Sequence, residues 1–227
     1  MAYKIFLSPS SQKANTYAYG NTTEDVQCGK IAKACKAALE RCGFEVKLEQ
    51  YDTTTNRVNH ANAWGADLYV PIHTNAFNGQ VTGTRIFCDS LTGESYKASK
   101  AIFDALAPIT PGKSENIKAS TQFYELRAPK APPVYVEAEF HDNKEAAKWI
   151  IENTAEIGEA IAKGICNYFK VAYKKTATVT EKPSEALQDG EYYQVVTGSF
   201  KNKKYAEQRV KELAAKGFDS FIQVKGK

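Results

Sequence analysis

Apolar residues follow two alternating patterns over the first 170 residues of the chain. Short runs rich in β-branched and aromatic residues predict strands at residues 3–8, 44–50, 66–76, 82–90 and 133–140. Longer amphipathic stretches predict helices at residues 24–44, 57–65 and 94–109, and one or two more within 144–169. This alternation favours an α/β domain with a mostly parallel, twisted sheet flanked by helices. Sites in such domains form at the carboxyl ends of the strands.

The pattern changes after residue 170. Residues 171–190 are rich in Thr, Lys, Pro and Ser, show no periodicity and predict a linker. Residues 191–227 return to order as a small β-α-β module. Such a short module rarely buries enough surface alone. We therefore expect it to pack on the domain formed by residues 1–170 or to pair with a copy of itself as a homodimer.

Composition narrows the class of protein without fixing it. The formal net charge of +4 is mild, so we expect no nucleic-acid partner. No apolar run approaches the roughly 18 residues of a membrane span. The first residues predict a strand rather than a cleavable signal. We therefore expect synthesis in the cytoplasm and, for any extracellular role, release by another route.

The chain has five cysteines, an odd number. Cys28, Cys35 and Cys42 are spaced seven residues apart and should share one stripe of the first helix. They lie too far apart along that helix to form disulfides with one another. We expect them to be small buried hydrophobic side chains, and the absence of a CxxC pair leaves a metal site as the lesser alternative.

Ionisable residues interrupt two otherwise apolar strands. Glu137, Glu139 and His141 alternate along the strand at 133–140 and just beyond it, so we expect them to share one face. His73 ends the buried strand at 66–76, and Glu24 begins the first long helix. A structural histidine and a favourable helix-dipole placement are the plain alternatives for these two residues. A buried carboxylate without a role is costly, which makes Glu137 the strongest candidate.

Together these segments resemble a known family. The stretches "ADLYVPIHTNA", "TGTRIF" and "FYELRAPKAPPVYVEAEFHDN" are similar to the zinc-dependent N-acetylmuramoyl-L-alanine amidases of the amidase-3 type. That family cleaves the amide bond between muramic acid and the stem peptide of peptidoglycan. Its signature is matched by His73, Gly83 and Glu137 together with Phe140 and Asn143. The resemblance covers roughly residues 3–169.

The resemblance implies roles for individual residues. His73 and Glu24 fall on zinc ligands of the family, and Glu137 falls on its catalytic glutamate. Zinc would polarise the amide and activate water, and Glu137 would carry the water's proton to the leaving amine. Glu139 stands where relatives often have a small residue. We expect it either to contact the residues that bind the metal or to face the substrate. The third histidine, His60, is expected on the surface.

One loop departs from the family pattern. The family usually has an Asp-Pro-Gly-His-Gly type loop after its first strand, whereas this chain reads "LSPSSQK". Ser11 stands in the place of the ligand histidine, with Gln12 beside it. We therefore expect the third ligand to be His141, or else Ser11 or the amide oxygen of Gln12. If Gln12 is not a ligand, we expect it to contact substrate.

The C-terminal module has its own resemblance. The stretch "YYQVVTGSFKNKKYAEQRVKELAAKGFDSFIQV" is similar to the SPOR repeat, a module that binds peptidoglycan glycan strands without stem peptides. A full SPOR domain holds about two such units and this chain holds one. The candidate sugar contacts of this module are Tyr192, Gln194 and Phe200, because aromatic faces suit sugar rings. Their alternative role is to build the core of the module.

Three functions remain open at this stage. The preferred hypothesis is a zinc-dependent amidase that lyses bacterial cell walls, either as a phage endolysin or as a sporulation autolysin. The second is a non-catalytic peptidoglycan-binding protein whose zinc site is incomplete. A zinc peptidase or deacetylase acting on another amide is the third.

Overall fold

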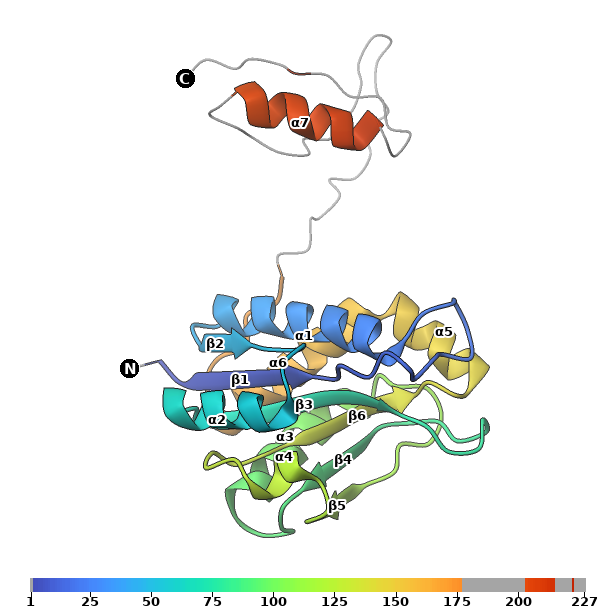
Figure 1. The fold of residues 1–227 in the computed structure, drawn as a ribbon. Coiled ribbons are helices and arrows are strands. Elements are labelled where there is room, and N and C mark those ends of the chain that lie inside the picture. Colours follow the sequence, from blue (N-terminus) through green and yellow to red (C-terminus); the bar gives the residue numbers. More distant parts are fainter. Residues whose placement is uncertain (1, 177–202, 215–221, 223–227) are drawn as a thin grey trace, which may run out of the picture. The chain divides into compact units, whose positions relative to one another are not determined.

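The computed structural model describes residues 2–176, 203–214 and 222. Six strands form one sheet in the order β2-β1-β3-β6-β4-β5 (Figure 1). Their bounds are β1 Lys4–Pro9, β2 Glu45–Leu48, β3 Leu68–Asn75, β4 Arg85–Cys88, β5 Ile117–Ala119 and β6 Tyr135–Phe140. Neighbouring strands are parallel except that β4 runs antiparallel to β6. The predicted α/β fold with a mostly parallel sheet is therefore confirmed.

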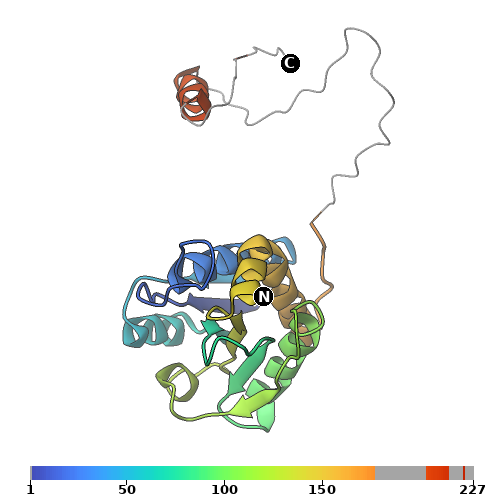
Figure 2. The ribbon, with the colours of Figure 1, turned by 90° about the vertical axis from the view of Figure 1, so that its right-hand side faces the viewer.

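Helices flank this sheet. Their bounds are α1 Glu24–Arg41, α2 Thr54–Trp64, α3 Gly93–Leu106, α4 Tyr124–Arg127, α5 Lys144–Glu152 and α6 Thr154–Phe169. Figure 2 shows α2 and α4 on one side of the sheet and α3 on the other. The short elements β5 and α4 were not predicted, because segments of three and four residues give no periodic signal.

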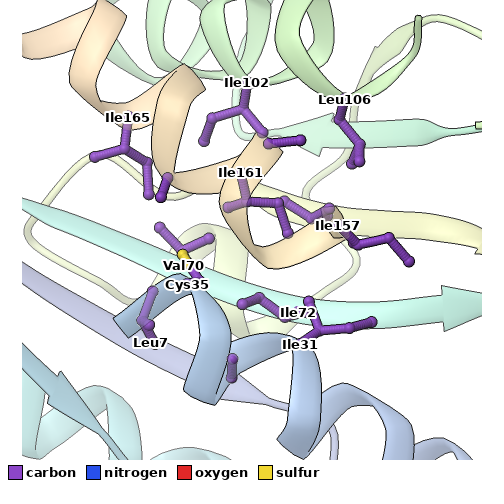
Figure 3. Close-up of a cluster of buried hydrophobic side chains, with 14 of the residues drawn as sticks. Leu7, Ile31, Cys35, Val70, Ile72, Ile102, Leu106, Ile157, Ile161 and Ile165 are labelled. Atoms are coloured by element: carbon purple, nitrogen blue, oxygen red, sulfur yellow. The ribbon is translucent and has the colours of Figure 1, made fainter. Parts of the chain in front are cut away.

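The larger hydrophobic core lies between the sheet and the helices α1, α3 and α6. Figure 3 shows Ile161 of α6 between Ile72 of the sheet and Ile102 of α3, and all three side chains are fully buried. All five cysteines are free and buried. This confirms the interpretation of Cys28, Cys35 and Cys42 as small buried hydrophobic residues.

A smaller core lies under α2 and α4. It contains Phe6 and Tyr69, whereas Leu7 and Val70, the next residue of each strand, belong to the larger core. This follows the two-residue period of a strand. His73 lies four residues after Tyr69, so the same period turns it toward the face covered by α2 and α4.

The chain divides into two compact units, Met1–Thr178 and Val179–Lys227. Residues 171–176, which we predicted to belong to a linker, instead lie within the first unit and pack against its helices. Arg41 donates to the carbonyl oxygen of Lys174, and Val171 and Tyr173 pack against the larger core. In the second unit the described residues include α7 Lys203–Ala214, a helix that the sequence predicts. Tyr192 and Phe200 lie outside the described residues.

No helix in the described part of the chain has the length and apolar character needed to cross a membrane.

Candidate active site

The candidate site lies where β1, β3 and β6 end. His73 of β3 and Glu137 of β6 are directly paired in the sheet. Both side chains are buried, with 6% and 9% of their surface exposed. The parallel arrangement of the two strands brings an imidazole and a carboxylate from distant parts of the sequence to the same edge.

Glu24 reaches this pair from the first turn of α1. Its Oε1 lies 2.9 Å from Nδ1 of His73, and the backbone N–H of Thr74 donates to the same oxygen over 3.4 Å. Burial raises the pKa of Glu24, but the hydrogen bond and charge of His73 outweigh it and the net pKa is lowered. Burial lowers the pKa of His73, while Glu24 and the nearby carboxylates outweigh it and raise the net pKa. The two shifts agree, because each group favours the charged form of the other.

The loop after β1 contributes two polar side chains to this contact. Nε2 of Gln12 lies 3.4 Å from Nδ1 of His73. Nδ2 of Asn15 donates to Gln12 over 3.1 Å and to Glu24 over 2.6 Å. Gln12, Asn15, Glu24 and His73 thus form one contiguous cluster, in which Gln12 is the loop residue that contacts the ring of His73.

Glu137 lies beside this cluster in a form suited to proton transfer. Its Oε2 is buried and has no hydrogen-bond partner among the described residues. Burial raises the pKa of Glu137 to about 7, with the charge of Glu24 acting in the same direction and those of His73 and Arg85 opposing it. A carboxyl group with a pKa near neutrality can both accept and release a proton at the pH of a cell.

Glu139 occupies a different environment. It is fully buried, and its Oε1 accepts hydrogen bonds from the backbone N–H groups of Gly83 and Phe140. Burial raises its pKa to about 7. This position favours a role in holding the loop before β4 over contact with substrate.

His141 joins the site from the opposite side of β3. Its Nδ1 lies 3.0 Å from both the carbonyl oxygen and the hydroxyl of Thr74, and its ring stacks on Tyr17 at 5.1 Å between centroids. The backbone carbonyl can only accept, so Nδ1 carries the proton and Nε2 is bare. Burial lowers the pKa of His141, which keeps the ring neutral.

We expected His141 to share a face with Glu137. The pairing of β3 with β6 shifts register between His73 and Asn75, and His141 contacts Thr74 rather than His73. Within the described part of the chain, the ligand atoms of Glu24, His73 and His141 do not all come within 4.8 Å of one another. His141 as a zinc ligand therefore stays a prediction.

A separate group of possible ligands lies on the surface. Ligand atoms of Glu49, Asp52 and His60 all lie within 4.8 Å of one another. The side chain of His60 is about half exposed, as predicted, and pairs with Glu49 at 2.7 Å. Asp52 and His60 are exposed and Glu49 is partly so, and Asp52 already accepts from the backbone N–H of Thr53. This group matters chiefly as a second place where added zinc could bind.

Three residues of the site were missed at the sequence level. Asn15 bridges Gln12 and Glu24, Tyr135 stacks on the ring of His73 at 4.5 Å, and Glu125 lies 3.9 Å from its Nε2. Tyr135 could have been found, because it precedes Glu137 by two residues and shares its face. Glu125 gave no signal, since it lies on the unpredicted α4.

Residues 6–167 match the N-acetylmuramoyl-L-alanine amidase family of the amidase-3 type. The chain is 28% identical over 231 residues to a sporulation-specific N-acetylmuramoyl-L-alanine amidase of Bacillus subtilis (strain 168), covering 98% of this chain and 85% of the relative. It is also 28% identical over 226 residues to the N-acetylmuramoyl-L-alanine amidase CwlM of Bacillus licheniformis, covering 96% and 84%.

Solved structures agree on the fold. The N-acetylmuramoyl-L-alanine amidase AmiC2 of Nostoc punctiforme superposes with a TM-score of 0.68 at 21% identity, covering 74% of this chain and 97% of that one. The sequence matches, rather than this likeness of fold, favour an enzyme over the non-catalytic wall-binding protein. The chain belongs to the N-acetylmuramoyl-L-alanine amidases of the amidase-3 type, which hydrolyse the amide bond between N-acetylmuramic acid and L-alanine in peptidoglycan.

Proposed function

We propose that this amidase depends on zinc, held by Glu24 and His73, and that Glu137 is its general base. The observation that carries the proposal is the 2.9 Å contact between Oε1 of Glu24 and Nδ1 of His73, with the unpartnered carboxylate of Glu137 alongside. Imidazole nitrogen and carboxylate oxygen are ordinary zinc ligands, and both groups are buried. The residues present therefore fit the ion that the family resemblance implies.

A third protein ligand is needed for a catalytic zinc site. Gln12 supports this role because its side-chain amide already lies beside Nδ1 of His73, and rotation of the amide would turn its oxygen toward the same point. His141 supports it through a bare Nε2 oriented by the bond between Nδ1 and Thr74. Ser11, the remaining alternative, makes no hydrogen bond within the described residues.

The residues of the chain divide the chemistry between them. When bound, zinc would polarise the scissile carbonyl group and make the attacking water more acidic. Glu137 takes a proton from that water at its free Oε2 and passes it to the nitrogen of the leaving L-alanine. Tyr135 holds the ring of His73 by stacking, and Asn15 holds the carboxylate of Glu24.

Cell-wall turnover is the setting we propose for this reaction. The relative in Bacillus subtilis is described as sporulation-specific, and its match covers 98% of this chain, so it extends into the second unit. A sporulation autolysin is thus favoured over a phage endolysin. In this proposal the SPOR-like module holds the enzyme on peptidoglycan, with Tyr192 and Phe200 as sugar contacts.

Zinc content and hydrolysis test the proposal together. The full-length chain and its His73→Ala variant are purified without added metal, loaded with zinc and assayed for zinc per chain and for release of L-alanine amino groups from peptidoglycan. His60→Ala is the control, because it removes the surface group while leaving the site intact. We expect stoichiometric zinc and hydrolysis in the control, and loss of both when His73→Ala is combined with His60→Ala. Wild-type protein that hydrolyses peptidoglycan without zinc would refute the metal dependence.

The third ligand is separated by Gln12→Ala and His141→Ala in the His60→Ala background. The variant that lacks a true ligand should bind zinc at least about ten-fold more weakly. If both variants bind zinc as tightly as the His60→Ala protein, neither residue is a ligand, and the third ligand is Ser11 or water.

A further inference from the structure

A buried carboxylate lies behind His73, on the side away from Glu24. Nε2 of His73 is buried and has no hydrogen-bond partner among the described residues. Oε2 of Glu125 lies 3.9 Å from it, within the range of an ion pair. Glu125 itself is only 5% exposed. The ring of His73 therefore lies between two carboxylates, one at each nitrogen.

We propose that Glu125 is a positioning residue that keeps a proton on Nε2 of His73 and so leaves Nδ1 free to bind the metal. The inference rests on the proposed zinc site. It concerns a residue that is neither one of the five signature positions named above nor a proposed ligand. It assigns a function to α4, a helix of four residues that packs against α2.

The contacts of Glu125 fix which of its oxygens faces His73. Ser8 of β1 donates to Oε1 over 2.6 Å, and the hydroxyl of Tyr69 on β3 lies 2.7 Å from the same oxygen. Nη2 of Arg57 lies 4.0 Å from Oε1. Three different elements thus hold Oε1, and Oε2 is left to face the imidazole.

The ring of His73 is held equally firmly. It stacks on Tyr135 with 17° between the planes, and Tyr135 in turn stacks on Phe123 with 4.8 Å between the ring centroids. Nδ1 faces Glu24 at 2.9 Å. The plane of the ring and the direction of its two nitrogens are therefore fixed. A neutral imidazole carries one proton, and the nitrogen without that proton is the one that can bind a metal.

Electrostatics then favours one tautomer when the metal is bound. A proton on Nε2 points at the carboxylate of Glu125, which is attractive, whereas a bare Nε2 would turn its lone pair toward that carboxylate. Burial strengthens both effects because the local dielectric is low. A carboxylate on the second nitrogen of a metal-binding histidine orients the ring and raises its basicity, and its loss typically weakens metal binding 10- to 100-fold.

The Glu125→Gln variant tests the inference with little change in volume. The hydroxyls of Ser8 and Tyr69 would bind the amide oxygen, so the amide NH₂ would face Nε2 and favour a bare nitrogen there. Zinc affinity is measured by competition with a chelator on the full-length chain, in the His60→Ala background. We expect about 10- to 100-fold weaker binding that still saturates at one zinc per chain. Glu159→Gln is the control, since it also removes a hydrogen-bonded carboxylate but lies away from the site.

A second measurement locates the proton on the ring of His73 directly. The chain contains three histidines, so nitrogen-15 spectra of labelled histidine are simple to assign with the His60→Ala and His141→Ala variants. In the zinc-loaded wild type we expect the metal on Nδ1 of His73 and a slowly exchanging proton on Nε2. In Glu125→Gln that proton should exchange faster and its signal should shift.

Each contrary result has a defined meaning. Unchanged zinc affinity in a folded Glu125→Gln variant would overturn the inference, as would a metal on Nε2 in the wild type. Failure to bind zinc even at saturation would make Glu125 a ligand, which also overturns it. If Glu125→Gln does not fold, Ser8→Ala replaces it, because it removes one donor to Oε1. A wild type that binds no zinc would overturn the proposed function as well, whereas the other results leave that function standing.

Discussion

At the scale of single residues, β6 carries two buried glutamates with different surroundings. Burial raises the pKa of both Glu137 and Glu139 to about 7. Oε2 of each glutamate is buried without a hydrogen-bond partner among the described residues, but only Glu139 has its Oε1 bound to the backbone, by the N–H groups of Gly83 and Phe140. Burial therefore raises both pKa values, whereas the backbone contacts distinguish Glu139, which holds a loop, from Glu137, for which we propose the role in proton transfer.

The proposed role of Glu137 as general base predicts a defined kinetic change. Glu137→Gln keeps the shape of the side chain but cannot accept a proton, so kcat should fall by about 10²- to 10⁴-fold while zinc content stays unchanged. In the wild type, kcat/KM should fall at acid pH as Glu137 becomes protonated. Bound zinc lowers this pKa, so the acid limb should lie below the metal-free value of about 7. An active Glu137→Gln variant with normal zinc would remove Glu137 as the base.

Glu139 should instead affect stability. Its pKa is raised above the ordinary value of 4.5, so the folded state binds more protons than the unfolded state between that pH and about 7. Stability should therefore fall as the pH rises through this range, by up to about 3 kcal/mol, and stay at the lower level above it. The Glu139→Gln variant should lack the part of this pH-dependent fall in stability that Glu139 causes. Denaturant unfolding at about pH 5 and pH 8 measures it, and identical pH dependence in variant and wild type would contradict the assignment.

For single residues, the sequence predicts the position of a side chain well on a regular strand and poorly beyond the end of one. His73, Glu24 and Glu137 meet as the family resemblance implies, because strand ends and a helix start fix their places. The face of His141 was predicted wrongly, since simple alternation cannot foresee the register shift between β3 and β6. Glu125 approaches His73 only through tertiary packing.

At the scale of elements, glycines mark where segments pass close together. Gly158 lies inside α6, where glycine is unfavourable. A Cβ there would lie 2.6 Å from the carbonyl oxygen of Ile31 on α1, so the glycine allows the two helices to approach. Sequence alone predicts both helices, but it identifies neither their partner nor the reason for this glycine.

Gly83 combines a left-handed backbone with a close contact. Its φ is +107°, its N–H donates to Glu139, and a Cβ would lie 2.4 Å from the carbonyl oxygen of Lys113. Gly83→Ala should therefore lower the free energy of unfolding by more than 3 kcal/mol, on the order expected for combined backbone strain and overpacking.

Gly43→Ala is the matched control for this substitution. Its φ is +94°, yet nothing lies within 4 Å of a Cβ at that position. The control should lose only about 1–2 kcal/mol, the cost of the left-handed conformation alone. Denaturant midpoints measure both variants, and equal losses would show that the contact with Lys113 is relieved at little cost.

At the scale of the whole molecule, the boundary of the first unit differs from the one predicted at residue 170. The polar composition of residues 171–190 indicated a linker, because composition reports average preference and not individual contacts. The structure shows Tyr173 and Thr176 bonded to Glu159 of α6, and Lys174 bonded to Arg41 and Cys42 at the end of α1. The segment 171–176 thus ties together α1 and α6, two of the three helices that cover the larger core.

Two truncated chains test this boundary. A chain that ends after Thr178 keeps the segment, whereas one that ends after Lys170 loses its hydrogen bonds and the packing of Val171 and Tyr173. We expect both to fold and to cleave a soluble muramoyl peptide, since the segment contributes no residue to the site. The shorter chain should be less stable by about 2–4 kcal/mol, given roughly 1 kcal/mol for each lost hydrogen bond and partial exposure of two apolar side chains. Thermal and denaturant unfolding of the two chains provide the comparison. Equal stability of the two chains would show that residues 171–176 do not stabilise the first unit, and would restore the boundary at residue 170. A loss of stability in the expected range would place the start of the linker beyond residue 176.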